Sequence, residues 1–251
     1  MNTKCYMKKT LAYYSKWLGE DGILLQTFDG IKSVYQQERN KVQYGYGQPF
    51  DIYIFVMADK IIVSYGDKAK PQIGALRDCV GDFVTIEDLK SALKTIYGKD
   101  VVHNVKYVFN GKKTDDCSAR LLDKYDYEAY ENFYIKCNPN CSDLDWLQAY
   151  FEEMICGKLC SGAYEGSILV SCADAPGMPY MSDEVQEIGI NTLPDYRGKG
   201  YATIACQSSI NEMLKNGKVP QWSTSTTNIA SQKLAEKLGF VRLGDVITLT
   251  I

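Results

Sequence analysis

The sequence lacks several features that identify common classes of protein. It has a single histidine, His103, among 251 residues, which argues against a zinc site built from histidines. Because His103 lies in a strand-like run, we expect it to be structural. The chain has no apolar run of about 18 residues, the length that predicts a membrane-spanning helix. Neither the Gly-x-Gly-x-x-Gly fingerprint of dinucleotide-binding proteins nor the Gly-Lys-Ser/Thr of nucleoside-triphosphate loops occurs.

Charge and cysteine content narrow the classes further. The formal net charge of −3 at pH 7 argues against a nucleic-acid-binding surface. The N-terminal residues include lysines but no apolar segment follows them, so we expect no signal peptide and a cytoplasmic location. There the nine cysteines are expected to be free thiols. The pairs Cys137/Cys141 and Cys156/Cys160 are spaced more widely than most zinc ligands, so we expect buried thiols and no metal.

The most informative segment is a basic, glycine-rich turn between a predicted strand and a predicted helix. The strand covers Glu187–Leu193 and ends before Pro194, which has no N–H to donate to a sheet. The helix covers Gly200–Asn216 and carries apolar residues on one face. The turn Arg197-Gly-Lys-Gly200 brings positive charge and glycine to the N-terminus of this helix. Unpaired N–H groups, the helix dipole and the missing Cβ atoms together predict a phosphate or pyrophosphate site.

Two segments of the C-terminal half resemble motifs of one protein family. Arg197-x-x-Gly200-x-Ala202 resembles the Arg/Gln-x-x-Gly-x-Gly/Ala signature of the GNAT superfamily of acyl-CoA-dependent N-acetyltransferases. The segment from Asn228 to Phe240 resembles the Asn-x-x-Ser helix, ending in Gly-Phe, that lies beside the cofactor in that family. The resemblance implies an α/β (α+β) fold, in which helices flank a mixed, mostly antiparallel sheet whose fourth and fifth strands splay apart.

The same resemblance implies acetyl-CoA as the acyl donor and assigns its contacts. The backbone of residues 198–203, with Arg197 and Lys199 nearby, is expected to hold the pyrophosphate. The pantetheine arm is expected to enter the gap between the splayed strands and to pair with the backbone around Ile190 and Thr192. We expect Ser231 to cap or pack its helix rather than to take part in the chemistry. The residues expected to bind the cofactor are Ile190, Thr192, Arg197, Gly198, Lys199, Gly200, Tyr201, Ala202, Thr203, Asn228 and Ser231.

The resemblance also implies the catalytic residues. In the family, a carboxylate at the start of the fourth strand often removes a proton from the attacking amine, and Glu187 holds that position. Glu184 is the reserve candidate, and the alternative for Glu187 is a solvated charge at the edge of the strand. The usual acid is a tyrosine in the last helix, but Ala235 stands there. The thiolate therefore leaves with hydrogen-bond help alone or takes a proton from another tyrosine. Cys172 or Cys206 as a nucleophile is a further alternative, although neither has an evident histidine base.

The chain is predicted to divide at the polar stretch Asn110–Asp116. Residues 1–116 are expected to form a smaller α+β domain of unknown role. Residues 117–251 are expected to form the GNAT domain and contain every cofactor motif.

Local patterns predict individual elements in both parts. Strands over 49–57 and 60–65 are expected to form a hairpin, and Thr85–Tyr97 is expected to form a helix that Thr85 and Asp88 cap. A second helix is expected over Ser142–Cys156, with Ser142 as its N-cap. More than one strand is expected at the C-terminus, the last being Val246–Ile251.

These observations favour an acetyltransferase that moves the acetyl group of acetyl-CoA to a primary amine of a small molecule. Direct attack in a ternary complex, without an acyl-enzyme, is the usual route in the family. The missing tyrosine keeps a second interpretation open, a GNAT-fold protein that binds acyl-CoA and regulates without turnover. We expect a monomer or a homodimer with no nucleic-acid or membrane partner. The loop over 137–145 that would shape the acceptor pocket has no recognisable pattern, and a polyamine-like or amino-sugar acceptor is the one to test.

Overall fold

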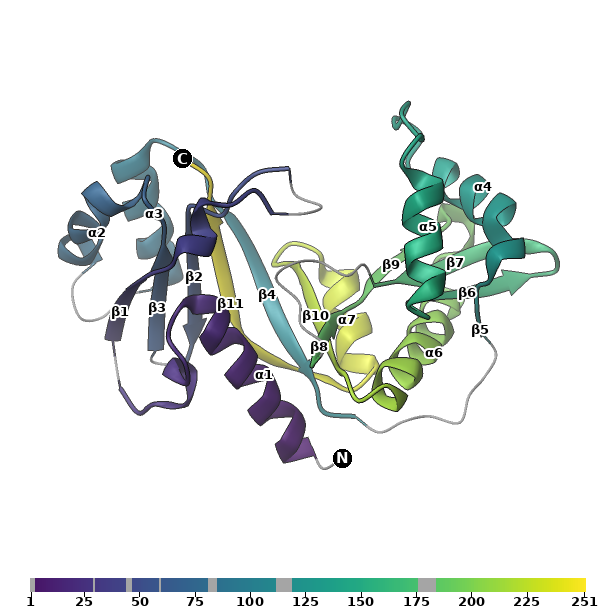
Figure 1. Ribbon diagram of the computed structural model, residues 1–251, viewed down its shortest axis with the longest axis horizontal. Helices are drawn as coiled ribbons and strands as arrows, with labels where there is room; N and C mark the ends of the chain where they lie inside the picture. Colours follow the sequence, from purple (N-terminus) through teal and green to yellow (C-terminus); the bar gives the residue numbers. More distant parts are fainter. Residues whose placement is uncertain are drawn as a thin grey trace.

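The molecule consists of two β-sheets with helices packed against them (Figure 1). This computed structural model describes residues 3–28, 30–43, 47–58, 60–80, 85–111, 119–175 and 184–251. Most of the predicted linker and Asp59 of the predicted hairpin turn lie outside the described residues. No helix of the described part of the chain is both long and apolar enough to span a bilayer.

The larger sheet has seven strands and is mixed. In spatial order they are β1 (Gly30–Tyr35), β3 (Lys60–Tyr65), β2 (Ile52–Met57), β11 (Phe240–Leu249), β4 (Val102–Phe109), β10 (Val219–Ser225) and β8 (Val185–Glu187). The outermost pair at each edge, β1 with β3 and β10 with β8, runs parallel. The inner neighbours run antiparallel, so the mixed, mostly antiparallel sheet is confirmed.

The smaller sheet has four strands, all antiparallel. In spatial order they are β5 (Arg120–Leu121), β6 (Cys160–Glu165), β7 (Ile168–Asp174) and β9 (Gly189–Thr192). Strands β8 and β9 follow each other directly along the chain but belong to different sheets. The two sheets are therefore linked at Ile188, the residue between these strands.

Helices cover both sheets and divide the apolar interior into clusters. The helices are α1 (Thr3–Leu18), α2 (Ile73–Val80), α3 (Ile86–Tyr97), α4 (Tyr127–Cys137), α5 (Leu147–Cys156), α6 (Tyr201–Lys215) and α7 (Ile229–Lys237). Strand β2 shows how alternation directs side chains to opposite faces. Ile52 and Ile54 pack with α2 and α3, whereas Tyr53 and Phe55 pack with α1. Helices α4 and α5 pack against β7 in a separate cluster.

Strand β4 occupies the centre of the larger sheet, although it precedes the predicted division of the chain. It pairs along its length with β11 on one side and with β10 on the other. Figure 1 shows β4 and β11 crossing the middle of the molecule side by side. The larger sheet thus runs across the predicted division at residue 116, and the two-domain arrangement stays a prediction.

Two local predictions are confirmed in the N-terminal part. Strands β2 and β3 form the antiparallel hairpin. Helix α3 begins after Thr85, whose side chain accepts a hydrogen bond from the Asp88 N–H at 3.1 Å while Asp88 caps in return. It ends at Gly98, which has a φ of 66°. Thr85 and Asp88, which the sequence identified, therefore cap the N-terminus of the helix, and Gly98 in a left-handed conformation ends it.

Three predicted elements differ from the structure. The predicted strand Glu187–Leu193 is broken at Ile188, because the chain leaves β8 in one sheet and enters β9 in the other. Helix α5 begins at Leu147 rather than at Ser142, because the Asp143 side chain accepts a hydrogen bond from the Asp145 N–H at 3.1 Å and holds a turn there. The C-terminus forms one strand, β11, instead of several. The strand continues through a register shift between Arg242 and Gly244, where a Cβ at Gly244 would lie 2.3 Å from the Val56 carbonyl oxygen.

Candidate active site

The candidate site lies where one segment of chain passes from one sheet to the other. Val185–Glu187 pairs with β10, and the Ile188 N–H still donates to the Gln221 carbonyl at 3.3 Å. From Gly189 onward the chain pairs with β7 instead. Beyond Ile188 the strands β9 and β10 are therefore not paired with each other, which is the splayed arrangement that the resemblance implied.

The backbone of β9 offers hydrogen-bonding groups to the space beside β10. The Leu193 N–H donates to the Val170 carbonyl at 2.9 Å, and the Asn191 carbonyl accepts from Ser171 Oγ at 3.0 Å. Because backbone groups alternate in direction along a strand, those of Ile190 and Thr192 point away from β7. Ile190 and Thr192, the two residues expected to pair with a pantetheine arm, therefore face the gap. The Thr192 carbonyl already accepts a hydrogen bond from Arg197 Nε at 3.2 Å.

The glycine-rich turn leaves open space at the N-terminus of α6. Gly198 and Gly200 have φ angles of 74° and 94°, a left-handed conformation that favours glycine. An added Cβ at either position would meet no atom within 4 Å. Gly200 is the N-cap of α6 and provides no side-chain hydrogen bond. The first N–H groups of the helix are therefore available to a ligand.

A groove of about 580 Å³ joins this turn to the gap beside β9 and to helix α7. Its lining comprises Ile190, Asn191, Thr192, Tyr196, Arg197, Gly198, Gly200, Tyr201, Ala202, Thr203, Asn228, Ala230, Ser231, Lys233, Leu234 and Lys237. Every residue predicted to bind the cofactor lines the groove except Lys199, whose Nζ lies 4.9 Å from the centre of the Tyr196 ring. Sequence reasoning missed Lys233 and Lys237, one turn apart on α7. The lining of the groove, among the residues that the structure describes, has no acidic residue, so the groove suits an anionic ligand.

The residues predicted on α7 hold the wall of the groove together. Asn228 caps α7, because its Oδ1 accepts a hydrogen bond from the Ser231 N–H at 3.1 Å. Ser231 Oγ accepts a hydrogen bond from Trp222 Nε1 on β10 at 3.0 Å. The expectation that Ser231 caps or packs its helix agrees with these contacts. Ala235 is fully buried and supplies no hydroxyl.

The predicted base, Glu187, forms a buried ion pair. Its carboxylate is bound by the ammonium of Lys106 on β4 and accepts a hydrogen bond from the Tyr14 hydroxyl of α1 at 3.4 Å. The two side chains of the pair are 14% and 8% exposed, so Glu187 is no solvated strand-edge charge. Burial alone lowers the pKa of Lys106, but Glu187 together with Tyr14 and Tyr53 outweighs burial and holds this pKa well above its ordinary value. Lys106 therefore stays charged at neutral pH.

Lys106 and Tyr14 are functional candidates that the sequence analysis missed. Lys106 interrupts an apolar run of β4, and a charged residue inside a buried strand is a readable signal for a specific partner. The partner itself, 81 residues further along the chain, could not be read. Glu184, the reserve base, lies just before β8, where its carbonyl accepts a hydrogen bond from the Val219 N–H at 2.8 Å.

The remaining nucleophile and histidine candidates have structural environments. Cys206 is buried on α6, which raises the pKa of its thiol. A hydrogen bond with Cys160 and burial raise the pKa of the Cys172 thiol. A raised thiol pKa disfavours the reactive thiolate. His103 Nε2 lies 2.9 Å from Asp245 Oδ1 on the neighbouring strand β11, as expected for a structural histidine. Within the described ranges no cluster of three His, Cys, Asp or Glu side chains could hold a metal ion.

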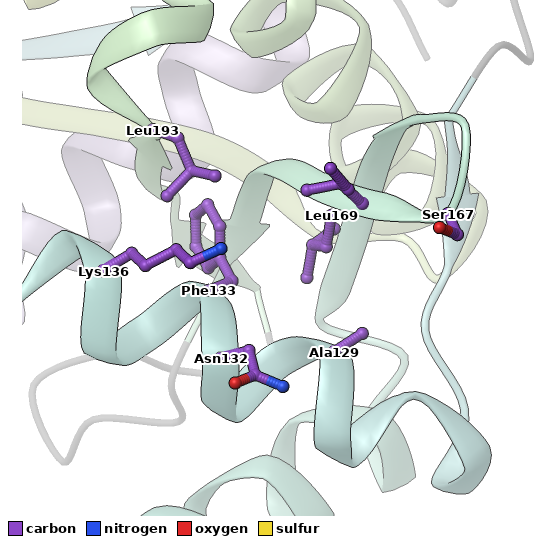
Figure 2. Close-up of a pocket in the computed structure, with 8 residues that line it drawn as sticks. Ala129, Asn132, Phe133, Lys136, Ser167, Leu169 and Leu193 are labelled. Carbon is purple, nitrogen blue, oxygen red and sulfur yellow. The ribbon is translucent and has the colours of Figure 1, made fainter.

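A second cavity, of about 330 Å³, lies between α4 and β7 (Figure 2). Ala129, Asn132, Phe133 and Lys136 line it from one face of α4. Figure 2 shows Lys136 extending past the ring of Phe133, with Leu169 and Leu193 opposite the helix. The lining of this second cavity has one charged side chain, Lys136, and none of the carboxylates or thiols considered above.

Comparison with known proteins identifies the family. A sequence model described as GNAT acetyltransferase matches residues 83–247. The chain belongs to the GNAT acetyltransferase family. The GNAT match begins before the predicted division of the chain and includes α3 and β4. No curated protein matches the sequence.

Several solved structures are similar to the chain at low sequence identity. A GNAT-family acetyltransferase from Colwellia psychrerythraea is 18% identical with a TM-score of 0.51, over 61% of this chain and 58% of that one. A GNAT-family protein from Novosphingobium aromaticivorans DSM 12444 is 21% identical with a TM-score of 0.48, over 59% and 63%. The chain thus spans about three fifths of both. A Salmonella typhimurium protein, solved with acetyl-CoA, is 20% identical with a TM-score of 0.43, over 53% and 91%.

Proposed function

We propose that the protein transfers the acetyl group of acetyl-CoA to a primary amine of a small molecule by direct attack in a ternary complex. The observation that carries the proposal is the groove that joins the open N-terminus of α6 to the gap beside β9. Membership of the GNAT acetyltransferase family supports the same reaction. We further propose that the protein acts in the cytoplasm as a monomer or a homodimer.

The residues of the groove fit the chemical parts of acetyl-CoA. A diphosphate suits the glycines of the turn, where added Cβ atoms would fill open space, and the cations Arg197, Lys233 and Lys237. An extended chain with amide groups suits the backbone of Ile190 and Thr192, as in the addition of a strand to a sheet edge. The bound thioester would activate the acetyl carbon toward a nucleophile.

The chain must then manage the protons of the acceptor. An alkylammonium has a pKa near 10.4, so at neutral pH a proton must leave its nitrogen before attack and a second one during collapse of the tetrahedral intermediate. Attack forms the new C–N bond, collapse breaks the C–S bond, and the CoA thiolate takes up a proton. Glu187, beside the point where the strands separate, is the proposed acceptor of one nitrogen proton.

The second candidate function is binding of acyl-CoA without turnover. It is favoured by Ala235, which is buried at the position where the family has a tyrosine acid. A free thiol has a pKa near 8.5, so CoA thiolate can leave without a dedicated acid, and we prefer the enzyme. Steady release of free CoA thiol in the presence of an amine would separate the two functions, because a regulator would bind acetyl-CoA and release none.

Acetyl-CoA binding is tested by thermal unfolding. Ligand at about 100 times its dissociation constant stabilises the folded state by roughly 2.7 kcal/mol, which for a chain of this size raises the Tm by roughly 5–10 °C. Gly200→Glu should abolish the shift, because it places bulk and negative charge where the phosphates are expected. Gly98→Glu is the matched control, since Gly98 also has a positive φ of 66° and no atom within 4 Å of an added Cβ. An unchanged wild-type Tm with both acetyl-CoA and CoA would refute the proposal.

A further inference from the structure

A second carboxylate, Asp174, lies at the point where the two sheets separate. It ends β7 and pairs across the sheet with Gly189, the first residue of β9. A Cβ at Gly189 would lie only 2.4 Å from Asp174 Oδ1. The carboxylate therefore lies over the backbone of Gly189, one residue before Ile190 and the gap expected to receive the thioester arm.

The surroundings of Asp174 contain neutral groups. The Tyr150 hydroxyl of α5 donates a hydrogen bond to Asp174 Oδ2 at 3.0 Å. Tyr130 and Tyr134 of α4, with the thiols Cys172 on β7 and Cys206 on α6, also lie within its electrostatic reach. None of the ion pairs among the described residues involves Asp174. Burial raises the pKa of Asp174, and the hydrogen bond from Tyr150 offsets part of that effect.

Contacts among three aromatic side chains connect this carboxylate to the surface. Trp146, at the end of the α4–α5 loop, is 42% exposed. Its ring centre lies 5.5 Å from that of Tyr134 and 5.6 Å from that of Tyr150, both in edge-on geometry. Tyr150 in turn holds Asp174 through its hydroxyl. Aromatic rings attract an organic cation and the methylene groups beside it.

We infer that Asp174 binds the acceptor as a primary alkylammonium ion, with Tyr134, Trp146 and Tyr150 against its alkyl chain, and takes its proton before attack. This inference rests on the proposed function and names the acceptor class for the same site. The ammonium N–H bond breaks, its electrons stay on nitrogen, and the proton moves to a carboxylate oxygen of Asp174. The neutral amine then attacks the thioester carbon. Asp174 returns its proton to solvent after the product leaves.

Asp174 and Glu187 both lie near Ile188, where the chain passes from one sheet to the other, a point called here the strand switch. The two carboxylates differ in their suitability for this step. Glu187 is already paired with the ammonium of Lys106. Asp174 has a hydroxyl donor but no cation among its described partners, so protonation there loses no ion pair. The first proton of the ammonium is therefore assigned to Asp174. Glu187 then either accepts the second proton, which nitrogen loses during collapse of the tetrahedral intermediate, or only holds the strand in place.

Asp174→Asn tests the assignment through the pH dependence of turnover. With n-butylamine as acceptor, kcat/KM at pH 7 should fall by roughly 10²–10⁴, while the Tm shift with acetyl-CoA stays as in wild type. The loss should shrink as the pH approaches about 10.4, where the amine is already neutral. Asp78→Asn, an exposed carboxylate on α2, is the matched control and should keep wild-type turnover.

Two aromatic variants test the rest of the site. Tyr150→Phe removes the donor that stabilises the Asp174 carboxylate, so the acid limb of the kcat/KM profile should move to higher pH; Tyr125→Phe, at a residue 83% exposed, should leave the profile unchanged. Wild-type kcat/KM should rise with chain length from ethylamine to n-hexylamine. In Trp146→Ala that dependence should flatten.

The outcomes separate this inference from the proposed function. A loss in Asp174→Asn that persists at high pH, or near-normal turnover at pH 7, would overturn the base assignment while acetyl transfer stands. Wild-type protein that binds acetyl-CoA but acetylates none of the alkylamines would overturn the acceptor class. A wild-type Tm unmoved by acetyl-CoA would instead refute the proposed function itself.

Discussion

The ion pair between Lys106 and Glu187 provides the sharpest test of how the structure holds its strand switch. Lys106→Met removes the ammonium but keeps a side chain of similar length. Glu187 would then remain as a carboxylate that is only 14% exposed and has lost its cation. The Tyr14 hydroxyl, at 3.4 Å, remains beside it as a hydrogen-bond donor. The substitution should therefore destabilise the protein strongly.

The size of the effect follows from burial. Removing one partner of a buried pair costs about 3–5 kcal/mol, because the remaining buried charge loses its counter-ion. For a chain of this length, that loss lowers the Tm by roughly 6–20 °C. The double variant Lys106→Met/Glu187→Gln removes both charges and should cost less than Lys106→Met alone. Urea unfolding at pH 7 of the four proteins of this cycle, the wild type, Lys106→Met, Glu187→Gln and the double variant, measures the loss of stability in each variant and the coupling energy between the two residues.

The pH dependence provides a second readout. The pKa of Lys106 is raised in the folded state. Its contribution to the free energy of unfolding is therefore fully present below the ordinary lysine pKa of about 10.4 and is lost as the pH rises through the pKa in the folded state. Lys106→Met should lack this alkaline loss. Lys94→Met, which breaks an exposed pair with Asp100, is the control and should remain close to wild type. If Lys106→Met were as stable as this control, or the double variant were the least stable protein of the cycle, the reasoning would be wrong.

Further variants test the other parts of the site. Glu187→Gln should reduce kcat with a loss that persists at high pH, since the nitrogen proton assigned to Glu187 leaves after attack. Recovery of kcat at pH 10 would instead assign the first nitrogen proton to Glu187. Lys233→Ala with Lys237→Ala should weaken acetyl-CoA binding several-fold in titrations at low salt and less at high salt; equal loss at both would exclude a charge effect. Asn228→Ala should cost about 0.5–2 kcal/mol of stability, measured by urea unfolding. Cleavage at a protease site inserted within 112–118 should leave the two pieces associated on gel filtration, because β4 pairs with β10 and β11; separation would contradict this.

The groove around the glycine turn could be predicted from the sequence because its signals are local. A glycine turn, a basic residue and the start of a helix are adjacent along the chain, and their geometry follows from the backbone rules of a helix N-terminus. The structure accordingly gathers Arg197, Gly200 and Thr203 in one groove. Asn228 was readable for the same reason, since a cap is defined by residues within one turn.

The acid–base side could not be predicted because its contacts join distant segments. Lys106 meets Glu187 from a strand that the sequence assigned to another domain. Asp174 gains its significance from Tyr150 and from the absent side chain of Gly189, neither of which is its neighbour in sequence. A lone aspartate at the end of a strand predicts nothing until the topology places it at the switch.

The strand switch at Ile188 suggests why the N-terminal part is present. A strand that leaves one sheet for another has no continuous ladder to fix its direction, so side chains must hold it at the point of departure. Gln221 helps, because its carbonyl accepts the Ile188 N–H and its side chain donates to Thr10 on α1 at 2.8 Å. Glu187 is held by Lys106 and Tyr14 in the same way. Helix α1 and strand β4 thus anchor one arm of the gap, and the geometry of the proposed acetyl-transfer site depends on residues at both ends of the sequence.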